Sequence, residues 1–320
     1  MSPPNRLIGS ALERVEDLRL LRGRGQFVAD INRPNQLHAA ILRSSVAHGL
    51  LRGIDTVAAL KLDGVQVVLT ARDLGQTVPR LPIRLQPLPE LEPFCQPMLA
   101  DEKVRYVGEP VAVVVAESPA IAEDALDLIE IEIDPLTAIT SRDQAEAAET
   151  LLFPEHLSNV SMRWNAVKGD AGTAFETADY TRRETFAVQR HAALFMEPRG
   201  FVAEWDASAE KLTVWGAAKV AFANRKILAA TMGLDLDQID MIEGDVGGSF
   251  GSRGEFYPED FLVPFASRHI GRPVKWVEDR YEHLMAANHA RQIECDVAIA
   301  ATRDGKILAL RGTNWPDNGA

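Results

Sequence analysis

A glycine-rich stretch, GDVGGSFGSRGEFYPE at residues 244–259, is well suited to present backbone groups to a ligand. Glycine costs backbone entropy, so a cluster of four needs a reason, either a tight turn or a close approach to another molecule. The pattern predicts a strand at 238–246 and a helix at 258–270 on its two sides. A strand, a glycine loop and a helix in this order direct backbone N–H groups toward an anion. The spacing alone leaves both a bare turn and an anion-binding loop open.

The familiar nucleotide loops do not fit this stretch. A dinucleotide loop needs the spacing G-x-G-x-x-G, and Val246 stands where its second glycine would have to be. A Walker loop needs the pattern G-x-x-x-x-G-K-[ST], and that pattern is absent here. A ligand of this loop is therefore expected to be a cofactor with phosphate groups or fused-ring edges.

Three other segments carry polar residues that could do chemistry. The segment RHAALFMEPRG at 190–200 contains His191, Glu197 and Arg199. The six-residue spacing of the histidine and the glutamate does not suit a metal site, so a loop with locally paired charges is favoured. Lys219 lies between a predicted strand and a predicted helix, where its amine faces either a cofactor or water. The segment RYVGEP at 105–110 predicts a turn closed by a salt bridge.

The composition excludes several classes of protein. The formal net charge of −12 argues against sequence-independent binding of nucleic acid or of an anionic membrane. Apolar runs such as VAVVVA at 111–116 are far too short to span a membrane. The first residues lack the apolar core of a secretory signal, so a cytoplasmic location is predicted. Cys95 and Cys295 are isolated, and without a C-x-x-C pair the chain is expected to hold neither an iron–sulfur cluster nor a structural zinc by itself.

The length of 320 residues predicts two domains. The first is placed at 18–140. Its clearest unit is a strand at 109–117, buried on both faces, then a helix capped by Ser118 and started by Pro119, then a half-buried strand, which together form a β-α-β unit. That half-buried strand is placed at 128–136. Further strands of this domain are predicted at 25–31 and 35–45, and 64–74 is predicted as a strand that enters a helix.

A polar, alanine-rich connector at 141–165 precedes the second domain at 166–320. Strands of one sheet are predicted at 181–191, 199–206 and 211–217. A helix at about 220–232 follows, ending near Gly233, and Gly271 is expected to stop the helix at 258–270. A strand at 272–279 and a hairpin at 291–313, turning at Asp304-Gly305, complete the series. Because nothing after the last strand covers its edge, the chain is expected to be cut or to be completed by another chain.

Taken in order, these segments resemble the molybdopterin-binding large subunit of the xanthine dehydrogenase/aldehyde oxidase family of molybdenum hydroxylases. The stretches LLRGRGQFVADI, LADEKVRYVGEPVAVVVAES and AEDALDLIEIEID are similar to its α/β hammerhead domain. The stretches FMEPRGFVAEWD, VWGAAKVAFANR, GDVGGSFGSR, GRPVKWVEDRYE and AANHARQIECDVAIAATRDGKILAL are similar to the first part of its molybdopterin-binding domain. The resemblance implies an α+β fold in which the hammerhead comes first and the cofactor domain is incomplete.

The resemblance also implies a cofactor site. The family's G-G-x-F-G loop places backbone N–H groups against the pterin near the metal. The cofactor-binding residues implied here are Lys219, Gly247, Gly248, Ser249, Phe250, Gly251 and Arg253. No direct metal ligand is implied, and the family's catalytic glutamate is expected beyond Ala320, so the chain by itself is expected to be inactive.

The sequence departs from the family at three positions of this site. Lys219 stands where the pattern W-x-x-x-Q often has glutamine, and it adds a positive charge near the apical side of the metal. Gly254 stands where xanthine-oxidising members have a purine-orienting glutamate, and Arg253 replaces a lysine. These differences indicate a subgroup other than xanthine oxidation proper.

The resemblance implies hydroxylation of an aldehyde or an N-heterocycle with water as the oxygen source. The implied cofactor is molybdenum-molybdopterin, in its simple or its cytosine dinucleotide form, with iron–sulfur clusters and FAD on partner subunits. The implied partners are the remaining half of the molybdopterin subunit, an iron–sulfur subunit and an FAD subunit, assembled as a dimer of heteromers. Two alternatives stay open: a truncated, non-catalytic paralogue that serves as a scaffold or assembly module, and an unrelated nucleotide-binding protein, which the loop spacing disfavours.

Overall fold

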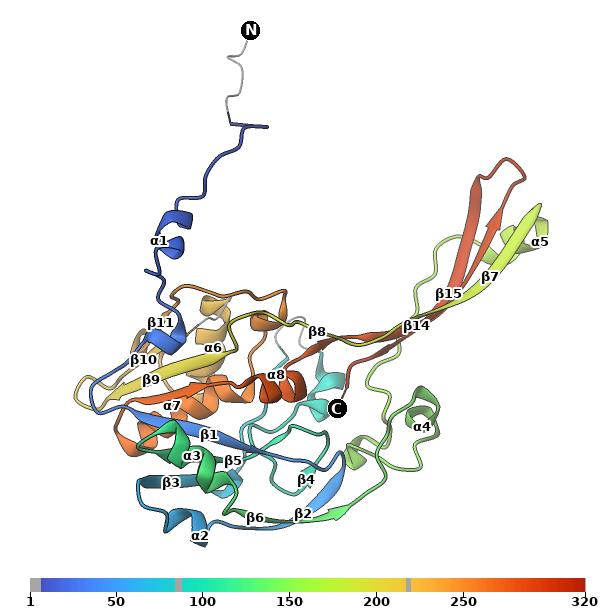
Figure 1. Ribbon diagram of the computed structural model, residues 1–320. Helices are drawn as coiled ribbons and strands as arrows, with labels where there is room; N and C mark the ends of the chain where they lie inside the picture. Colours follow the sequence, from blue (N-terminus) through green and yellow to red (C-terminus); the bar gives the residue numbers. More distant parts are fainter. Residues whose placement is uncertain (1–6, 84–87, 217–219, 320) are drawn as a thin grey trace.

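A seven-stranded mixed sheet forms the centre of the fold in a computed structural model that describes residues 7–83, 88–216 and 220–319 (Figure 1). The strand order is β11-β10-β9-β12-β1-β5-β3. In chain order these strands are β1 (Leu37–Arg43), β3 (Val65–Thr70), β5 (Pro110–Ala116), β9 (Gly200–Asp206), β10 (Lys211–Gly216), β11 (Ile239–Ile242) and β12 (Val274–Val277). The sheet thus joins strands from both halves of the sequence, because β1 pairs with β12. Confirming the α+β prediction, helices and strands are mixed, and most neighbours in this sheet are antiparallel.

The strand β5 is buried along its whole length, as its apolar run predicts. Its side chains alternate between two cores. Val113 and Val115 join the larger core under helices α6 (Ala221–Met232) and α7 (Pro258–Ile270). Val114 joins a smaller core on the opposite face, under α2 (Val57–Leu60) and α3 (Pro119–Leu126). A strand buried on both faces needs no polar alternation, which explains the continuous run of valine and alanine.

The predicted β-α-β unit is wrong in its pairing. The strand after α3, β6 (Glu130–Pro135), lies in a separate sheet of order β4-β2-β6, with β2 (Gly49–Asp55) and β4 (Lys103–Val104). The antiparallel neighbours β1 and β3 already occupy both edges of β5, so β6 has no edge there to join. The predicted strand at 25–31 is also wrong. Val28–Asp30 forms a 3-10 turn, because the Asp30 carboxylate accepts the Phe27 N–H at 3.0 Å in place of a ladder partner.

The start of α3 agrees with its sequence signal. Ser118 is the N-cap, and its hydroxyl accepts the backbone N–H of Ile121 at 3.2 Å. Ser118→Ala is therefore expected to lower the free energy of unfolding by about 1 kcal/mol, measured by urea denaturation, because one N–H at the helix start loses its partner. Ser118→Asp keeps an acceptor at the same place and is expected to stay within about 0.5 kcal/mol of the parent. Equal losses in both variants would contradict the cap.

Helices α6 and α7 cover the larger core, and α7 contacts both β9 and β12. Both helices end where glycine predicts, at Gly233 and Gly271, which adopt left-handed conformations with φ of 62° and 72°. Five shorter or peripheral elements complete this part and its surroundings: α1 (Asp17–Leu21), α4 (Arg142–Ala147), α8 (Arg280–Ala286), β8 (His191–Ala192) and β13 (His289–Ala290). The segment 141–165, expected to be a connector, carries α4.

A three-stranded arm projects from the body, formed by β7 (Tyr180–Val188), β14 (Gln292–Ala301) and β15 (Ile307–Asp317), with α5 (Ala171–Thr177) near its tip (Figure 1). The hairpin between β14 and β15 turns at Gly305 as predicted. The expectation of one sheet for 181–217 is wrong, because β7 pairs with β14 while β9 and β10 lie in the central sheet. Phe186 and Leu310 lie on one face of the arm and are 58% and 61% exposed, and the charged pair of Arg182 and Glu184 lies on the same face.

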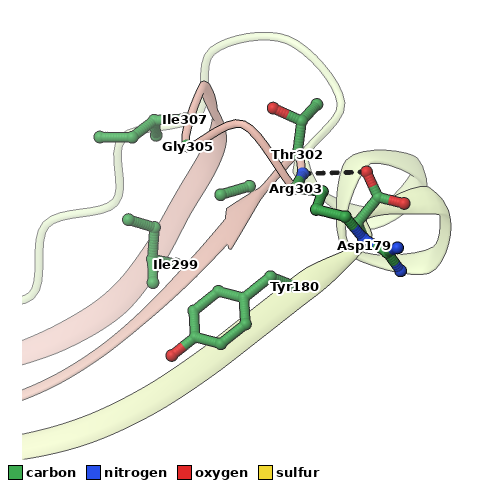
Figure 2. A pocket seen from close by; sticks show the side chains of 8 residues that line it. Asp179, Tyr180, Ile299, Thr302, Arg303, Gly305 and Ile307 are labelled. Carbon is green, nitrogen blue, oxygen red and sulfur yellow. Dashed lines mark hydrogen bonds between the residues drawn. The ribbon is translucent and has the colours of Figure 1, made fainter.

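At the tip of the arm, a shallow hollow of about 380 Å³ lies between Tyr180, Ile299 and Ile307 (Figure 2). The Arg303 backbone N–H donates to the Asp179 carboxylate at 3.0 Å and closes the turn beside it. None of the described helices is both long and apolar enough to cross a membrane.

Candidate cofactor site

The glycine-rich loop connects β11 to α7 through a 3-10 turn at Ser252–Gly254. Three of its residues have positive φ: Gly248 at 108°, Phe250 at 46° and Gly251 at 99°. A left-handed phenylalanine is uncommon and marks a backbone held in an unusual shape. Among the described residues, the backbone N–H groups from Gly248 to Gly251 have no hydrogen-bond partner. Four successive free N–H groups form a surface that can receive an anion or the polar edge of a ring.

Two side chains of this loop are also left without protein partners. The Ser249 hydroxyl is buried and unpaired in the described structure, although a buried hydroxyl costs free energy unless it is bonded. The Phe250 ring is 79% exposed, on a loop where an apolar ring gains nothing from water. An unpaired hydroxyl and an exposed ring beside four free N–H groups fit a flat ligand with polar edges.

The structure gives the glycines separate reasons. A Cβ at Gly247 would lie 2.4 Å from the Cβ of Glu197, and one at Gly248 would lie 2.8 Å from the Cβ of Phe195. These two glycines therefore allow the loop to pack closely against the segment 195–199. Gly251 meets nothing within 4 Å, so only its φ of 99° favours glycine there. The sequence left open whether the glycines serve a tight turn or a ligand. Gly247 and Gly248 are needed for close packing against the chain itself, while the free N–H groups of the loop are available to a ligand.

Glu197 and Arg253 tie the loop to that segment. The Glu197 carboxylate accepts the Gly247 N–H at 2.7 Å and the Arg253 guanidinium at 3.1 Å. Arg253 also donates to the carbonyl groups of Gly248, at 2.8 Å, and of Pro198, at 3.0 Å. Its guanidinium stacks on the Phe195 ring, 4.5 Å from the centroid. Burial lowers the pKa of Arg253, and the Glu197 carboxylate opposes this shift.

Glu197 and Arg253, which together are called the latch, lie next to a network of buried charges around Arg199. Its guanidinium donates to Glu278 at 2.5 Å and to Glu259 at 3.1 Å, and it stacks over the Tyr257 ring at 3.9 Å. His283 contacts the second oxygen of Glu278 at 3.0 Å. The favoured interpretation of the segment 190–200, a loop with locally paired charges, is wrong. Glu197 pairs with Arg253, 56 positions away, and Arg199 pairs with residues 60 and 79 positions away.

The network also joins the two halves of the sequence. Arg43, at the end of β1, donates to Glu259 at 2.6 Å and to Glu282 at 3.0 Å. It also donates to the Gly108 carbonyl at 3.2 Å, in the turn that precedes β5. That turn contains the predicted pair of Arg105 with a glutamate, at 3.9 Å. The base of the candidate site is therefore fixed by contacts from the N-terminal half of the sequence.

Burial and pairing shift the pKa values of four carboxyl groups here in opposite directions. Burial disfavours the charged form of Glu259, but the guanidinium groups of Arg199 and Arg43 outweigh it and hold its pKa at about 2. Burial raises the pKa of Asp260, Glu282 and Glu109 to about 7, against opposing hydrogen bonds and charges. Glu259 is thus a permanent anion at neutral pH, while its neighbours titrate there.

The structure brings Gly247, Gly248, Ser249, Phe250, Gly251 and Arg253 together in one loop, as their spacing requires. Lys219 lies outside the described residues. His191 stands on β8, and no three histidine, cysteine, aspartate or glutamate side chains in the described ranges could hold a metal ion. Sequence reasoning missed Arg43, Glu259, Glu278, Glu282 and His283. Their only local signal is that charged residues directly adjoin apolar runs, as in PEDFLVPF and PVKWVED.

This combination of folds and loop defines a class, the large subunits of molybdenum hydroxylases. The family model for the aldehyde oxidase and xanthine dehydrogenase a/b hammerhead domain matches residues 22–137. The model for the molybdopterin cofactor-binding domain matches residues 152–320. The chain therefore belongs to the family of molybdopterin-binding large subunits that includes xanthine dehydrogenase and aldehyde oxidase.

Curated relatives and solved structures agree with this membership. The chain is 38% identical to the nicotine 6-hydroxylase large subunit of Paenarthrobacter nicotinovorans, over 100% of this chain and 39% of that protein. It is 34% identical to the carbon monoxide dehydrogenase large chain of Afipia carboxidovorans, over 98% and 40%. It superposes on quinoline 2-oxidoreductase from Pseudomonas putida 86 with a TM-score of 0.85 and 35% identity, over 96% and 39%. The chain thus spans about two fifths of the length of these relatives.

Proposed function

We propose that this chain forms one wall of the molybdenum-molybdopterin site in a hydroxylase that oxidises an aldehyde or an N-heterocycle. The observation that carries the proposal is the loop from Gly248 to Gly251, whose four free N–H groups accompany the orphaned Ser249 hydroxyl. When bound, this cofactor supplies two-electron oxidation of a carbon centre with oxygen from water. The relatives support the class of reaction, since they include a nicotine 6-hydroxylase and a carbon monoxide dehydrogenase.

In this proposal the residues of the loop have separate tasks. The N–H groups from Gly248 to Gly251 donate to polar edges of the pterin, and the Ser249 hydroxyl gives it one further hydrogen bond. The exposed Phe250 ring covers the pterin face and excludes water from it. Arg253 directs its guanidinium into the protein, so it acts through the shape of the loop. Lys219, which lies outside the described residues, is proposed as a further residue that would contact the cofactor.

The rest of the assembly is proposed from the resemblance and the relatives. The chain is expected to act with the remaining half of the molybdopterin subunit, which supplies the catalytic glutamate, and with iron–sulfur and FAD subunits. The proposal includes the cytosine dinucleotide form of the cofactor, a dimer of heteromers and a cytoplasmic location. The exposed Phe186 and Leu310 on one face of the arm support the presence of a protein partner, because exposed apolar side chains that gather on one face mark interaction surfaces.

The test is the metal content of the complex purified with all its subunits. We expect molybdenum by elemental analysis, and reduction of an artificial electron acceptor with an aldehyde or an N-heterocycle. Ser249→Ala is expected to reduce molybdenum retention by about fivefold to tenfold, because one hydrogen bond of about 1 kcal/mol is lost. Ser208→Ala, in the exposed turn after β9, is the matched control and should retain the parental content. A complete complex without molybdenum would favour the scaffold alternative instead.

A further inference from the structure

We propose that Glu197 is a positioning residue, whose carboxylate, together with Arg253, sets the direction of the loop N–H groups before any cofactor binds. This proposal rests on the proposed function for the identity of the ligand. Its geometric part, the fixed shape of the loop, is independent of that function. The side chains of both residues are largely buried, at 12% and 1% exposure.

Glu197 bonds the loop through both its side chain and its backbone. Its carboxylate accepts the Gly247 N–H at 2.7 Å, and its own backbone N–H donates to the Gly247 carbonyl at 3.2 Å. The second carboxylate oxygen accepts the Val28 N–H at 3.3 Å, which ties the same side chain to the segment before β1. One glutamate therefore fixes both polar groups of Gly247 against two neighbouring segments.

Arg253 fixes the next peptide from the other side. Its Nε donates to the Gly248 carbonyl at 2.8 Å, and its terminal nitrogen donates to the carbonyl groups of Glu197 and Pro198. These bonds use the planar, forked arrangement of donors that only arginine has, so a lysine could not make them all. The guanidinium is held in place by the Phe195 ring below it.

Because the peptide bond is planar, a loop carbonyl group that is hydrogen-bonded toward the protein fixes the direction of the N–H group of the next residue. In a trans peptide the C=O of one residue and the N–H of the next point in opposite directions. The Gly247 and Gly248 carbonyl groups are turned toward Glu197 and Arg253, so the N–H groups of Gly248 and Ser249 must point away from them. The Ser249 carbonyl accepts the Ser252 N–H in the same way and turns the Phe250 N–H outward. The Glu197 backbone N–H and the Arg253 side chain thus determine which way two of the four free donors face, and the Ser252 N–H determines a third.

The experiment compares Glu197→Gln, Arg253→Lys and the double variant in the full chain, with Glu204→Gln as the matched control. Glu204 is a half-buried glutamate on β9 that pairs with Arg33 at 2.8 Å, and it receives the same change of charge. The readouts are hydrogen exchange at the amides of Gly247 and Glu197, molybdenum content of the assembled complex and the thermal midpoint.

We expect exchange at Gly247 to accelerate about tenfold in both single variants, because weakening the hydrogen bond raises the population of the open state. Molybdenum retention should fall by about tenfold, while the thermal midpoint changes by only a few degrees. The double variant should be no worse than the more affected single variant, since both act on one unit. Glu204→Gln should resemble the parent in exchange and in molybdenum content.

Parental exchange at Gly247 in Glu197→Gln would overturn the positioning role. Additive losses in the double variant would also overturn it, because independent effects are not a latch. If the single variants do not fold, Glu197→Asp keeps the charge but shortens the side chain, and parental protection of Gly247 in that variant counts against the proposal. A parental complex without molybdenum would refute the proposed function alone, since the exchange measurement still decides whether Glu197 shapes the loop.

Discussion

Replacing Arg199 with methionine is expected to lower the free energy of unfolding by about 3–5 kcal/mol. The guanidinium lies between Glu259 and Glu278, and all three side chains are at most 3% exposed. Methionine fills a similar volume but leaves Glu278 with His283 as its remaining side-chain partner and Glu259 with Arg43. A buried carboxylate that loses its cation keeps the free-energy cost of desolvation but no longer has the ionic attraction that offsets it. Urea denaturation followed by tryptophan fluorescence measures the loss.

Two further variants separate pairing from packing. Arg33→Met removes a more exposed guanidinium that pairs with Glu204 at 2.8 Å, and it is expected to cost less than about 1 kcal/mol. Arg199→Lys keeps the charge but cannot bond two carboxylates in one plane, so an intermediate loss is expected. If Arg199→Met proved as mild as Arg33→Met, the network would not be a principal source of stability.

The local elements were predictable because their signals lie within a few residues. Ser118 and Pro119 start α3, Gly233 and Gly271 end two helices, and the run of β5 reveals burial on both faces. Each of these is a short-range consequence of backbone chemistry, such as an unpaired N–H at a helix start or a left-handed cap. The order of the segments was also sufficient to indicate the family.

The pairing of strands and the contacts of the site could not be predicted in the same way. The strand β6 alternates like any half-buried strand, and nothing local states that β1 and β3 already occupy both edges of β5. Likewise Glu197 and Gly247 are 50 residues apart, and neither local sequence indicates that the two residues are in contact. A glycine cluster shows that the backbone needs space, but only the structure shows that Glu197 and Phe195 occupy it.

The stability of the chain is expected to fall between pH 5 and pH 8, and Asp260→Asn is expected to reduce that fall. Burial raises the pKa of Asp260 from 3.8 to about 7, although its carboxylate accepts the Tyr257 N–H at 3.0 Å. The folded state therefore holds a proton that the unfolded state releases, and the resulting stability, complete below pH 3.8, is lost as the pH rises through 7. A shift of this size corresponds to roughly 4 kcal/mol.

Asparagine keeps the acceptor for the Tyr257 N–H but never ionises, so Asp260→Asn should gain stability relative to the parent at pH 8 and little at pH 5. Glu282 and Glu109, whose pKa values are also raised to about 7, leave a residual slope in the variant. Glu259 acts in the opposite sense, because its pKa of about 2 gives stability above its ordinary range that is lost only at lower pH. Urea denaturation at pH 5, 6, 7 and 8 measures the slopes, with Asp237→Asn as the exposed control. Parallel curves for the parent and Asp260→Asn would show that Asp260 does not titrate in this window, and that its burial is balanced by the N–H groups around it.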